Sequence, residues 1–265
     1  MRVGFIGLGS QGAPMARRIV EAGFETTLWA RRPESLAPFA DTPAEVAGSP
    51  AELGAAADLV CLCVVDDGDV GKVGEGVLEG LRPGGFLAVH STVHPDTCRR
   101  LAERAAAQDV TVLDAPVSGG GRAAEQGTLL VMVGGDEKAY DTCRPVFAAY
   151  GDPVAHLGPL GSGQVAKLLN NLLFTAQLGL AADTLALGDR LGLDPAALGR
   201  LLPRGSSASF ALERVVDSGG TLDRIGASAG RLLAKDVRLL TEVAGGSAPG
   251  PAGEAARAAL RAMGL

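Results

Sequence analysis

Three polar residues stand near the start of an apolar helical segment, residues 161–188: Lys167, Asn170 and Asn171. Lys167 and Asn171 are four residues apart, so on a helix their side chains lie on the same face. The apolar neighbours of Lys167 favour burial, whereas a lysine without a functional role usually extends its ammonium group to the surface. Burial disfavours its charged form. A lysine amine held at a reaction site can accept the proton of a substrate hydroxyl or return it, so we favour a catalytic role for Lys167.

A second group of candidate residues is the glycine pattern Gly7-x-Gly9-x-x-Gly12, which follows an apolar run and opens a helical one. In dinucleotide-binding folds the first glycine allows a tight turn, the second lets the backbone approach the pyrophosphate, and the third lets the helix pack on the strand. The N-terminus of the helix then faces the phosphates. We expect a nicotinamide dinucleotide to bind at this loop, which also contains Leu8, Ser10 and Gln11.

Arg31 and Arg32 follow the second predicted strand. An enzyme that prefers NAD usually carries Asp or Glu near this place to bind the ribose 2′-hydroxyl, whereas an arginine suits the extra phosphate of NADP. The acid is missing here, so the sequence predicts a preference for NADP, with NAD as the alternative. The competing interpretation is a pair of solvated surface arginines.

The segment "DAPVSGG", residues 114–120, follows another predicted strand. Its turn therefore lies at the carboxyl end of the sheet, where doubly wound folds bind their ligands. The hydroxyl of Ser118 and the amide groups of Gly119 and Gly120 could hold a substrate carboxylate. The alternative is an ordinary glycine turn.

These candidates need a scaffold, and the first 160 residues alternate short apolar runs with Ala-rich helical segments. The runs at 2–9, 25–30, 58–65, 85–91, 110–117 and 128–135 are typical of strands, and the segments 12–23, 49–57 and 95–108 are typical of helices. Because strand and helix alternate, we predict an α/β fold with a mostly parallel, doubly wound (Rossmann) sheet.

The rest of the chain shows no convincing strand after residue 158 and consists of long Ala/Leu-rich segments. We predict a dinucleotide-binding domain at 1–160 and an all-helical domain for substrate and assembly at 161–265, with the substrate between them. The stretch 245–257 suggests a flexible hinge before a short final helix.

Composition excludes several classes of protein. The formal net charge of −6 gives no basic field for nucleic acid or anionic lipid, and the apolar part of 161–188 falls short of the ~18 residues that a membrane span needs. The N-terminus shows no secretory leader, so we expect a cytoplasmic protein. The four cysteines fit neither a zinc pattern nor a disulfide framework; Cys61 and Cys63 are typical of reduced core thiols, and we expect no metal.

Four segments in order carry a resemblance to a known family: 4–23, 114–135, 161–171 and 235–240. Together they resemble the signatures of the beta-hydroxyacid dehydrogenases, the group of 3-hydroxyisobutyrate dehydrogenase and tartronate semialdehyde reductase, related to 6-phosphogluconate dehydrogenase. The resemblance spans residues 3 to about 243.

The resemblance implies a role for each matching position. Lys167 would be the general acid/base and Asn171 would orient it or the substrate, while Ser118, Gly119 and Gly120 would hold the substrate carboxylate. Asn170 projects roughly 100° from Asn171 on a helix, so we expect it to cap or bond the adjoining domain. The positions that would line the ribose and nicotinamide are Val64, Val65 and Thr92, and Lys235 would approach the cofactor from the helical domain, with Asp236 positioning the nearby helix.

The chain departs from the family pattern at a few positions. Gln11 replaces a usual methionine, Val65 a common proline, and Asp69 an asparagine that often meets the cofactor. The segment after residue 240 is also shorter than is usual in the family, so we expect the far wall of the substrate pocket or the subunit interface to differ.

These observations predict an oxidoreductase that prefers NADP and acts on a small β-hydroxy acid or its semialdehyde. Two alternatives remain open: an imine reductase on the same scaffold, against which Lys167 argues, and a dinucleotide-binding sensor or scaffold without turnover. The apolar helices and the resemblance predict a homodimer or homotetramer.

Overall fold

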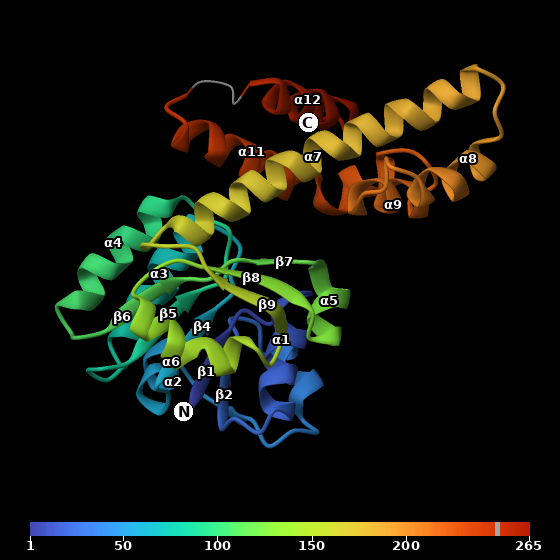
Figure 1. Cartoon of the computed structure of the whole chain (residues 1–265). Helices are drawn as coiled ribbons and strands as arrows, with labels where there is room; N and C mark the ends of the chain where they lie inside the picture. Colours follow the sequence, from blue (N-terminus) through green and yellow to red (C-terminus); the bar gives the residue numbers. More distant parts are fainter. Residues whose placement is uncertain (247–249) are drawn as a thin grey trace. The chain divides into compact units, whose positions relative to one another are not determined.

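The computed structural model describes residues 1–246 and 250–265, and its internal contacts divide the chain into two compact units, Met1–Lys167 and Leu168–Leu265. The first unit is built on a six-stranded sheet in the order β3-β2-β1-β4-β5-β6, in which every pairing is parallel (Figure 1). The strands are β1 (Val3–Ile6), β2 (Thr26–Trp29), β3 (Glu45–Val46), β4 (Leu59–Leu62), β5 (Phe86–Val89) and β6 (Thr111–Asp114). This order confirms the predicted doubly wound fold.

Helices connect these strands and cover both faces of the sheet. They are α1 (Gly12–Glu21), α2 (Pro50–Ala56), α3 (Asp67–Leu78) and α4 (Pro95–Ala106), with a 3₁₀ segment, η1 (Pro33–Phe39). Successive side chains of a strand point to opposite faces, so Phe5 joins a buried cluster with Met15 and Ile19 of α1, while Ile6 joins another with Leu53 of α2. All six predicted strands and the three predicted helices are confirmed.

A second, smaller sheet is a difference from the prediction. It has the order β7-β8-β9, from β7 (Val117–Ser118), β8 (Leu129–Val133) and β9 (Gly151–His156), with α5 (Gly120–Gln126) and α6 (Glu137–Phe147) between them. The strand expected at 128–135 is thus β8 of a separate sheet, and it touches the main one through an isolated bridge between Asp114 and Gly134. The β7–β8 pairing is antiparallel, whereas β8–β9 is parallel.

Helix α3 was not predicted, because its sequence, "DGDVGKVGEGVL", is rich in glycine, a weak helix former. The structure gives a reason for one of these glycines: a Cβ at Gly74 would lie 3.0 Å from a methyl group of Leu101 on α4. Glycine therefore permits the close approach of α3 and α4 at the cost of local helix propensity.

The second unit is helical throughout its described residues, as predicted. The long helix α7 (Ser162–Arg190) begins in the first unit and continues into this one. It is followed by α8 (Pro195–Leu201), η2 (Leu202–Arg204), α9 (Phe210–Asp217), α10 (Asp223–Ile225), a π-helical turn, η3 (Gly226–Gly230), α11 (Arg231–Val243) and α12 (Gly250–Ala262). Of the predicted hinge at 245–257, residues 247–249 lie outside the described residues, and the part from Gly250 on is α12.

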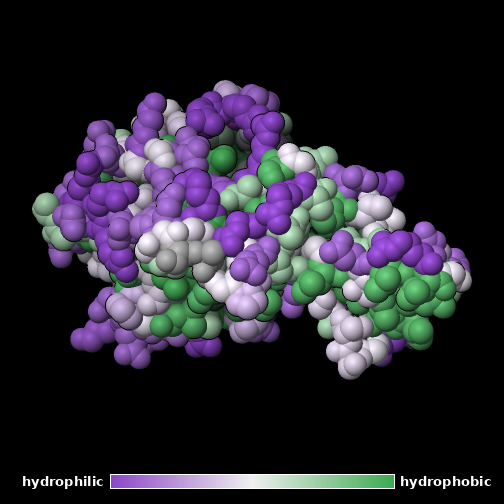
Figure 2. Space-filling view, turned by 90° about the horizontal axis from the view of Figure 1, so that it is seen from above, coloured by the Kyte–Doolittle hydropathy of each residue, from purple (hydrophilic) through white to green (hydrophobic). Residues whose placement is uncertain are grey.

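One face of α7 remains exposed along much of the helix. Its leucines recur at helical spacing, at Leu169, Leu173, Leu180 and Leu187, each between 46% and 59% exposed. Figure 2 shows hydrophobic side chains gathered at the right of the view, over the far end of α7. No helix in the described ranges has the length and apolarity that crossing a membrane requires.

Candidate functional site

The glycine-rich loop joins β1 to α1 at the carboxyl edge of the main sheet. Gly7 has φ +101°, and a Cβ there would overlap the carbonyl oxygen of Cys63. A Cβ at Gly12 would overlap the carbonyl oxygen of Gly7, whereas one at Gly9 meets no described atom within 4 Å. The loop is thus closed on the protein side and open at Gly9, which fits a backbone approached by a pyrophosphate.

The other loop residues support this geometry. Leu8 is anchored in the core at 9% exposure, while Ser10 is exposed and Gln11 stands at the N-cap of α1 without a capping hydrogen bond from its side chain. The first turn of α1 holds no acidic residue. The positive end of the helix dipole is therefore left available for an anion.

Arg31 and Arg32 lie directly after β2, and both are exposed. The guanidinium of Arg31 lies 3.3 Å from a carboxylate oxygen of Asp69 on α3, and that of Arg32 lies 4.0 Å from Glu34. Arg31 is 76% exposed in its side chain but Asp69 only 25%, so the carboxylate is the more firmly placed partner. Asp69, one of the departures from the family pattern, therefore faces the arginine expected to select the cofactor.

The loops after β4 and β5 carry Val64, Val65 and Thr92. The amide of Val64 donates to the Oγ of Ser91 over 2.8 Å, which joins the two loops, while Val65 is 59% exposed. Thr92 lies between residues whose backbone groups are both bound by Gln164. Neighbouring strands of a parallel sheet end at one edge, so these loops belong to the same edge as the glycine-rich loop.

Ser118 ends β7, and the two glycines after it open α5. Gly119 has φ +131° and Gly120 has φ +75°, conformations that side chains disfavour. A Cβ at Gly119 would also lie 2.6 Å from that of Ala123. The turn therefore requires glycine and presents the half-buried Ser118 just before a helix N-terminus, an arrangement suited to an anion.

Lys167 is 9% exposed and lies in the second turn of α7. The start of this helix is fixed by Asp114, the last residue of β6: its two carboxylate oxygens accept hydrogen bonds from the amides of Gly161 at 2.7 Å and Gln164 at 2.6 Å. Burial raises the pKa of Asp114, although these two hydrogen bonds oppose the shift. A strand residue thus caps the helix that carries the candidate acid/base.

Asn171 and Lys235, in the second unit, meet at one carboxylate. The amide of Asn171 donates to Oδ2 of Asp236 over 2.6 Å, and the ammonium of Lys235 lies 3.0 Å from Oδ1. Oδ1 accepts no hydrogen bond of good geometry from the described residues, so its contact with Lys235 is an ion pair. The side chain of Asn170 donates to that of Asn171 over 2.9 Å.

The candidates therefore form two sets. The glycine-rich loop, Arg31, the loops of Val64 and Thr92, the Ser118 turn and Lys167 belong to the first unit, while Asn171 and Lys235 are joined through Asp236 in the second. Sequence reasoning gave Asp236 a positioning role but could not name its two partners.

Three further polar residues of the first unit were missed as site components: Asp114, Gln164 and His90. His90 is 2% exposed; its Nδ1 lies 2.6 Å from the carbonyl of Ala115, and the hydroxyl of Tyr150 lies 3.1 Å from its Nε2. Burial lowers the pKa of His90 to about 4, so it is neutral, with the proton on Nδ1 for the carbonyl and Nε2 accepting from the hydroxyl. It anchors the segment that leads from Asp114 to Ser118.

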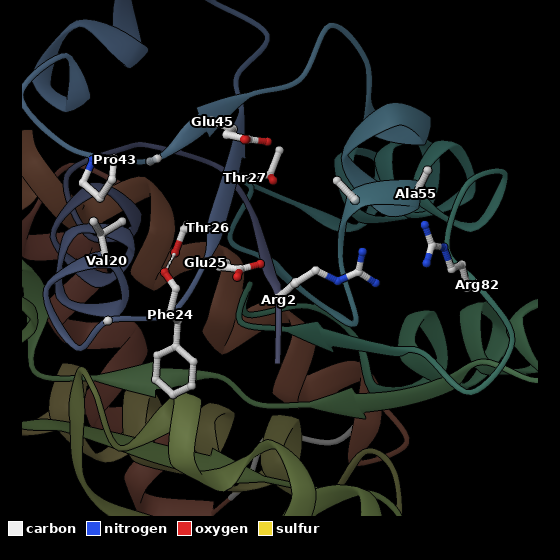
Figure 3. A pocket seen from close by; sticks show the side chains of 13 residues that line it. Arg2, Val20, Phe24, Glu25, Thr26, Thr27, Pro43, Glu45, Ala55 and Arg82 are labelled. Atoms are coloured by element: carbon white, nitrogen blue, oxygen red, sulfur yellow. Dashed lines mark hydrogen bonds between the residues drawn. The ribbon is translucent and has the colours of Figure 1, made fainter.

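A cavity of about 430 Å³ in the first unit lies at the opposite, amino-terminal edge of the sheet (Figure 3). Residues before or at the start of the strands line it, among them Arg2, Glu25, Thr26 and Glu45. None of the candidate residues belongs to it. Doubly wound folds bind ligands at the carboxyl ends of their strands, so this cavity is not the cofactor site.

The cysteines are free thiols, and burial raises the pKa of Cys61 and brings that of Cys63 to about 12. Both are thus protonated, weakly reactive core groups. Over residues 1–246 and 250–265, no cluster of three or more His, Cys, Asp or Glu side chains is placed to hold a metal ion.

Two protein-family models match the chain. The NAD binding domain of 6-phosphogluconate dehydrogenase matches residues 2–158, and the NAD-binding domain of NADP-dependent 3-hydroxyisobutyrate dehydrogenase matches residues 161–264. Between them they cover almost the whole chain.

Individual relatives agree with these families. A 3-hydroxyisobutyrate dehydrogenase of Pseudomonas aeruginosa is 34% identical over 91% of this chain and 82% of its own length. An NAD-dependent L-serine dehydrogenase of the same organism is 34% identical over 93% of this chain and 86% of its own. Among solved structures, Mycobacterium tuberculosis 3-hydroxyisobutyrate dehydrogenase with L-serine has a TM-score of 0.83 and 29% identity, covering 97% of this chain and 91% of that one.

Proposed function

Because the chain belongs to the 3-hydroxyisobutyrate dehydrogenase family, within the 6-phosphogluconate dehydrogenase superfamily of NAD(P)-binding oxidoreductases, we propose that it interconverts a small β-hydroxy acid and its semialdehyde. The proposed cofactor is NADP in preference to NAD, and the proposed general acid/base is Lys167. The observation that carries the proposal is the burial of Lys167 on a helix whose first turn is fastened to the carboxyl edge of the sheet.

The cofactor, when bound, supplies the carbon that accepts or returns the hydride. The chain holds it through the amides around Gly9, the N-terminus of α1, and Arg31 at the adenosine ribose. Val64, Val65 and Thr92 line the nicotinamide side, and Lys235 contributes from the helical unit. Arginine favours a 2′-phosphate through charge-assisted hydrogen bonds, which is the reason for preferring NADP.

The substrate class follows from the proposed anion site and from the relatives. Ser118, Gly119 and Gly120 bind the carboxylate, with the positive φ of both glycines fixing the turn. The names of two relatives specify 3-hydroxyisobutyrate and L-serine, which both carry a hydroxymethyl group next to the carbon that bears the carboxylate. This shared arrangement supports a small β-hydroxy acid as substrate.

Lys167 manages the proton of the reaction. In oxidation, its neutral amine accepts the proton of the substrate hydroxyl while the carbinol carbon loses hydride, so that a C=O bond forms; in reduction, its ammonium returns the proton. Asn171, held by Asp236, orients the amine or the substrate from one turn further along α7. Proton and hydride leave different atoms, so each needs its own acceptor.

A spectrophotometric panel tests the proposal and its alternatives. The purified chain is assayed at 340 nm with NADP or NAD and 3-hydroxyisobutyrate or L-serine, and with NADPH and a cyclic imine. Turnover of a β-hydroxy acid that is faster with NADP supports the proposal. Turnover of the imine alone would indicate an imine reductase, and cofactor binding without any turnover would indicate a sensor or scaffold.

Assembly is part of the proposal. The leucine face of α7 would remain exposed to solvent in a monomer. Contiguous apolar surface of this kind is typical of protein–protein contacts. A homodimer or homotetramer built through the helical unit would bury it.

A further inference from the structure

Gln164 is a buried side chain to which the proposed chemistry gives no role. It lies in the first turn of α7, three residues before Lys167, and it is 0% exposed. Burying a carboxamide costs free energy unless its hydrogen bonds are made. An apolar side chain at this position of the helix would avoid that cost. Its hydrogen bonds show what it does.

The carboxamide of Gln164 binds the backbone on both sides of Thr92. Its Nε2 donates to the carbonyl of Ser91 over 2.8 Å, and its Oε1 accepts from the amide of Val93 over 3.0 Å. The loop after β5 is therefore held by one side chain of α7. Because Ser91 Oγ accepts from the amide of Val64, the loop after β4 is tied to the same point.

The backbone of Gln164 is fixed as firmly as its side chain. Its amide donates to Asp114 Oδ2 over 2.6 Å, which joins this turn of α7 to the end of β6. Residues three apart on a helix are neighbours, with Cβ atoms ~5–6 Å apart. Lys167 thus lies one helix turn after a residue that is bonded to the end of β6 and to the loop after β5, on both sides of Thr92.

We propose that Gln164 is a positioning residue that sets Lys167 and the Thr92 loop in one fixed geometry. This inference rests on the proposed function, in which Lys167 moves the proton and Thr92 lines the nicotinamide. Proton and hydride must leave the same substrate together, so the amine of Lys167 and the Thr92 loop must be held at a fixed position relative to each other. Gln164 fixes this relative position through the two hydrogen bonds of its carboxamide to the backbone of the loop.

The test replaces Gln164 by methionine, which has nearly the same length but offers no amide donor or carbonyl acceptor. The matched control is Gln177→Met, the same change on the same helix at a half-buried position. For Gln164→Met we expect kcat to fall by about 10- to 100-fold, the usual cost of a misplacement near 1 Å, while the Kd of NADPH changes only a few-fold. Gln177→Met should keep kcat near that of the parent.

A double-mutant cycle separates positioning from general damage. If Gln164 acts through Lys167, Gln164→Met should cost little further activity once Lys167→Ala is present, because effects of residues that act as a unit are not additive. Additive losses in the double variant would show a merely structural role and overturn the inference. Where Gln164→Met does not fold, Gln164→Asn, whose shorter amide cannot span both partners, replaces it in the same cycle.

Different results would contradict the positioning role of Gln164 and the proposed function. If Lys167→Ala is inactive but folded Gln164→Met or Gln164→Asn keeps kcat within a few-fold, the positioning role is wrong and the proposed function stands. If Lys167→Ala itself keeps its activity, the proposed function fails and the inference fails with it. All kinetics use the hydroxy acid of the panel that gives the highest kcat/KM.

Discussion

The buried histidine of the first unit makes stability depend on pH in a predictable direction. His90 has an ordinary pKa of 6.5 when the chain is unfolded, and burial lowers it to about 4 in the folded protein. Between these values the unfolded chain binds the proton and the folded protein does not. The contribution is therefore fully present near pH 7 and is lost as the pH falls from about 6.5 towards 4.

The difference between 6.5 and about 4 is about 2.5 pH units, and each unit corresponds to ~1.4 kcal/mol. The full effect is thus ~3.5 kcal/mol, of which ~2 kcal/mol is already lost at pH 5. Replacing His90 by Asn removes the titrating group while keeping a donor for the carbonyl of Ala115. The variant should be less stable at pH 7 because the hydroxyl of Tyr150 loses its partner, but the part of the pH dependence due to His90 should disappear.

Urea unfolding between pH 4 and 7.5 measures this, followed by the fluorescence of Trp29, the one tryptophan of the chain, which lies on β2 of the same unit. Asp114, with its raised pKa, acts in the opposite direction and is common to both proteins, so the difference between their curves isolates His90. Tyr150→Phe is the control, because it removes the same hydroxyl and leaves the histidine in place; its curve should keep the loss at low pH. Parallel curves for the parent and His90→Asn would refute the reasoning.

The remaining predictions concern catalysis, cofactor choice and assembly. Lys167→Ala should lower kcat by about 10²–10⁴ with little change in the Kd of NADPH, and Lys167→Arg should not restore it, because a guanidinium does not give up its proton near neutral pH; turnover within a few-fold of the parent would assign the proton to another group. Arg31→Ala should weaken the binding of NADPH more than that of NADH. Asp69→Asn should strengthen the binding of NADPH, because it releases Arg31 from the ion pair and removes a negative charge close to the site proposed for the 2′-phosphate. Calorimetry measures both Kd values, and equal changes for the two cofactors would contradict the role of the pair. Ser118→Ala should raise KM for carboxylate substrates more than it lowers kcat, if the contact is equally strong in the ground and transition states; the reverse split in steady-state kinetics argues against it. Light scattering at micromolar concentration should give the mass of a dimer or larger, and a monomer mass would leave the leucine face of α7 without its proposed cover.

Features determined by neighbouring residues were predictable. The glycine-rich loop, for example, combines a strand, a turn and a helix start within residues 3–21, and the structure explains Gly7 and Gly12 by overlaps that any Cβ would cause. The alternation of strands and helices predicted a mostly parallel, doubly wound sheet for the same reason. Helix α3 was missed where glycine serves the contact with α4, because tertiary packing overrides local propensity.

The fastening of α7 was not predictable, because its partners are far apart in the sequence. Asp114 is 47 and 50 residues from the amides that it binds, and Gln164 is 71 and 73 residues from its two partners on the Thr92 loop. The ion pair of Arg31 with Asp69 joins residues 38 positions apart. The negative charge of Asp69 partly offsets that of the arginine, which the sequence around Arg31 did not indicate. Such pairs depend on which strand ends meet at one edge of the sheet.

The position of Lys167 on α7 would suit the proposed proton transfer. An isolated first turn frays, because its amides have no partners within the helix. Here Asp114 and Gln164 bind that turn to the end of β6 and to the loop after β5. One turn beyond Lys167, the side chain of Asn171 donates to Asp236 of α11. Lys167 therefore follows a helix turn that is fixed within the first unit, and the residue one turn beyond it is bound within the second. A helix turn fixed in this way limits the cost of ordering a flexible side chain, which would be the physical advantage of placing the proposed acid/base here rather than on a loop.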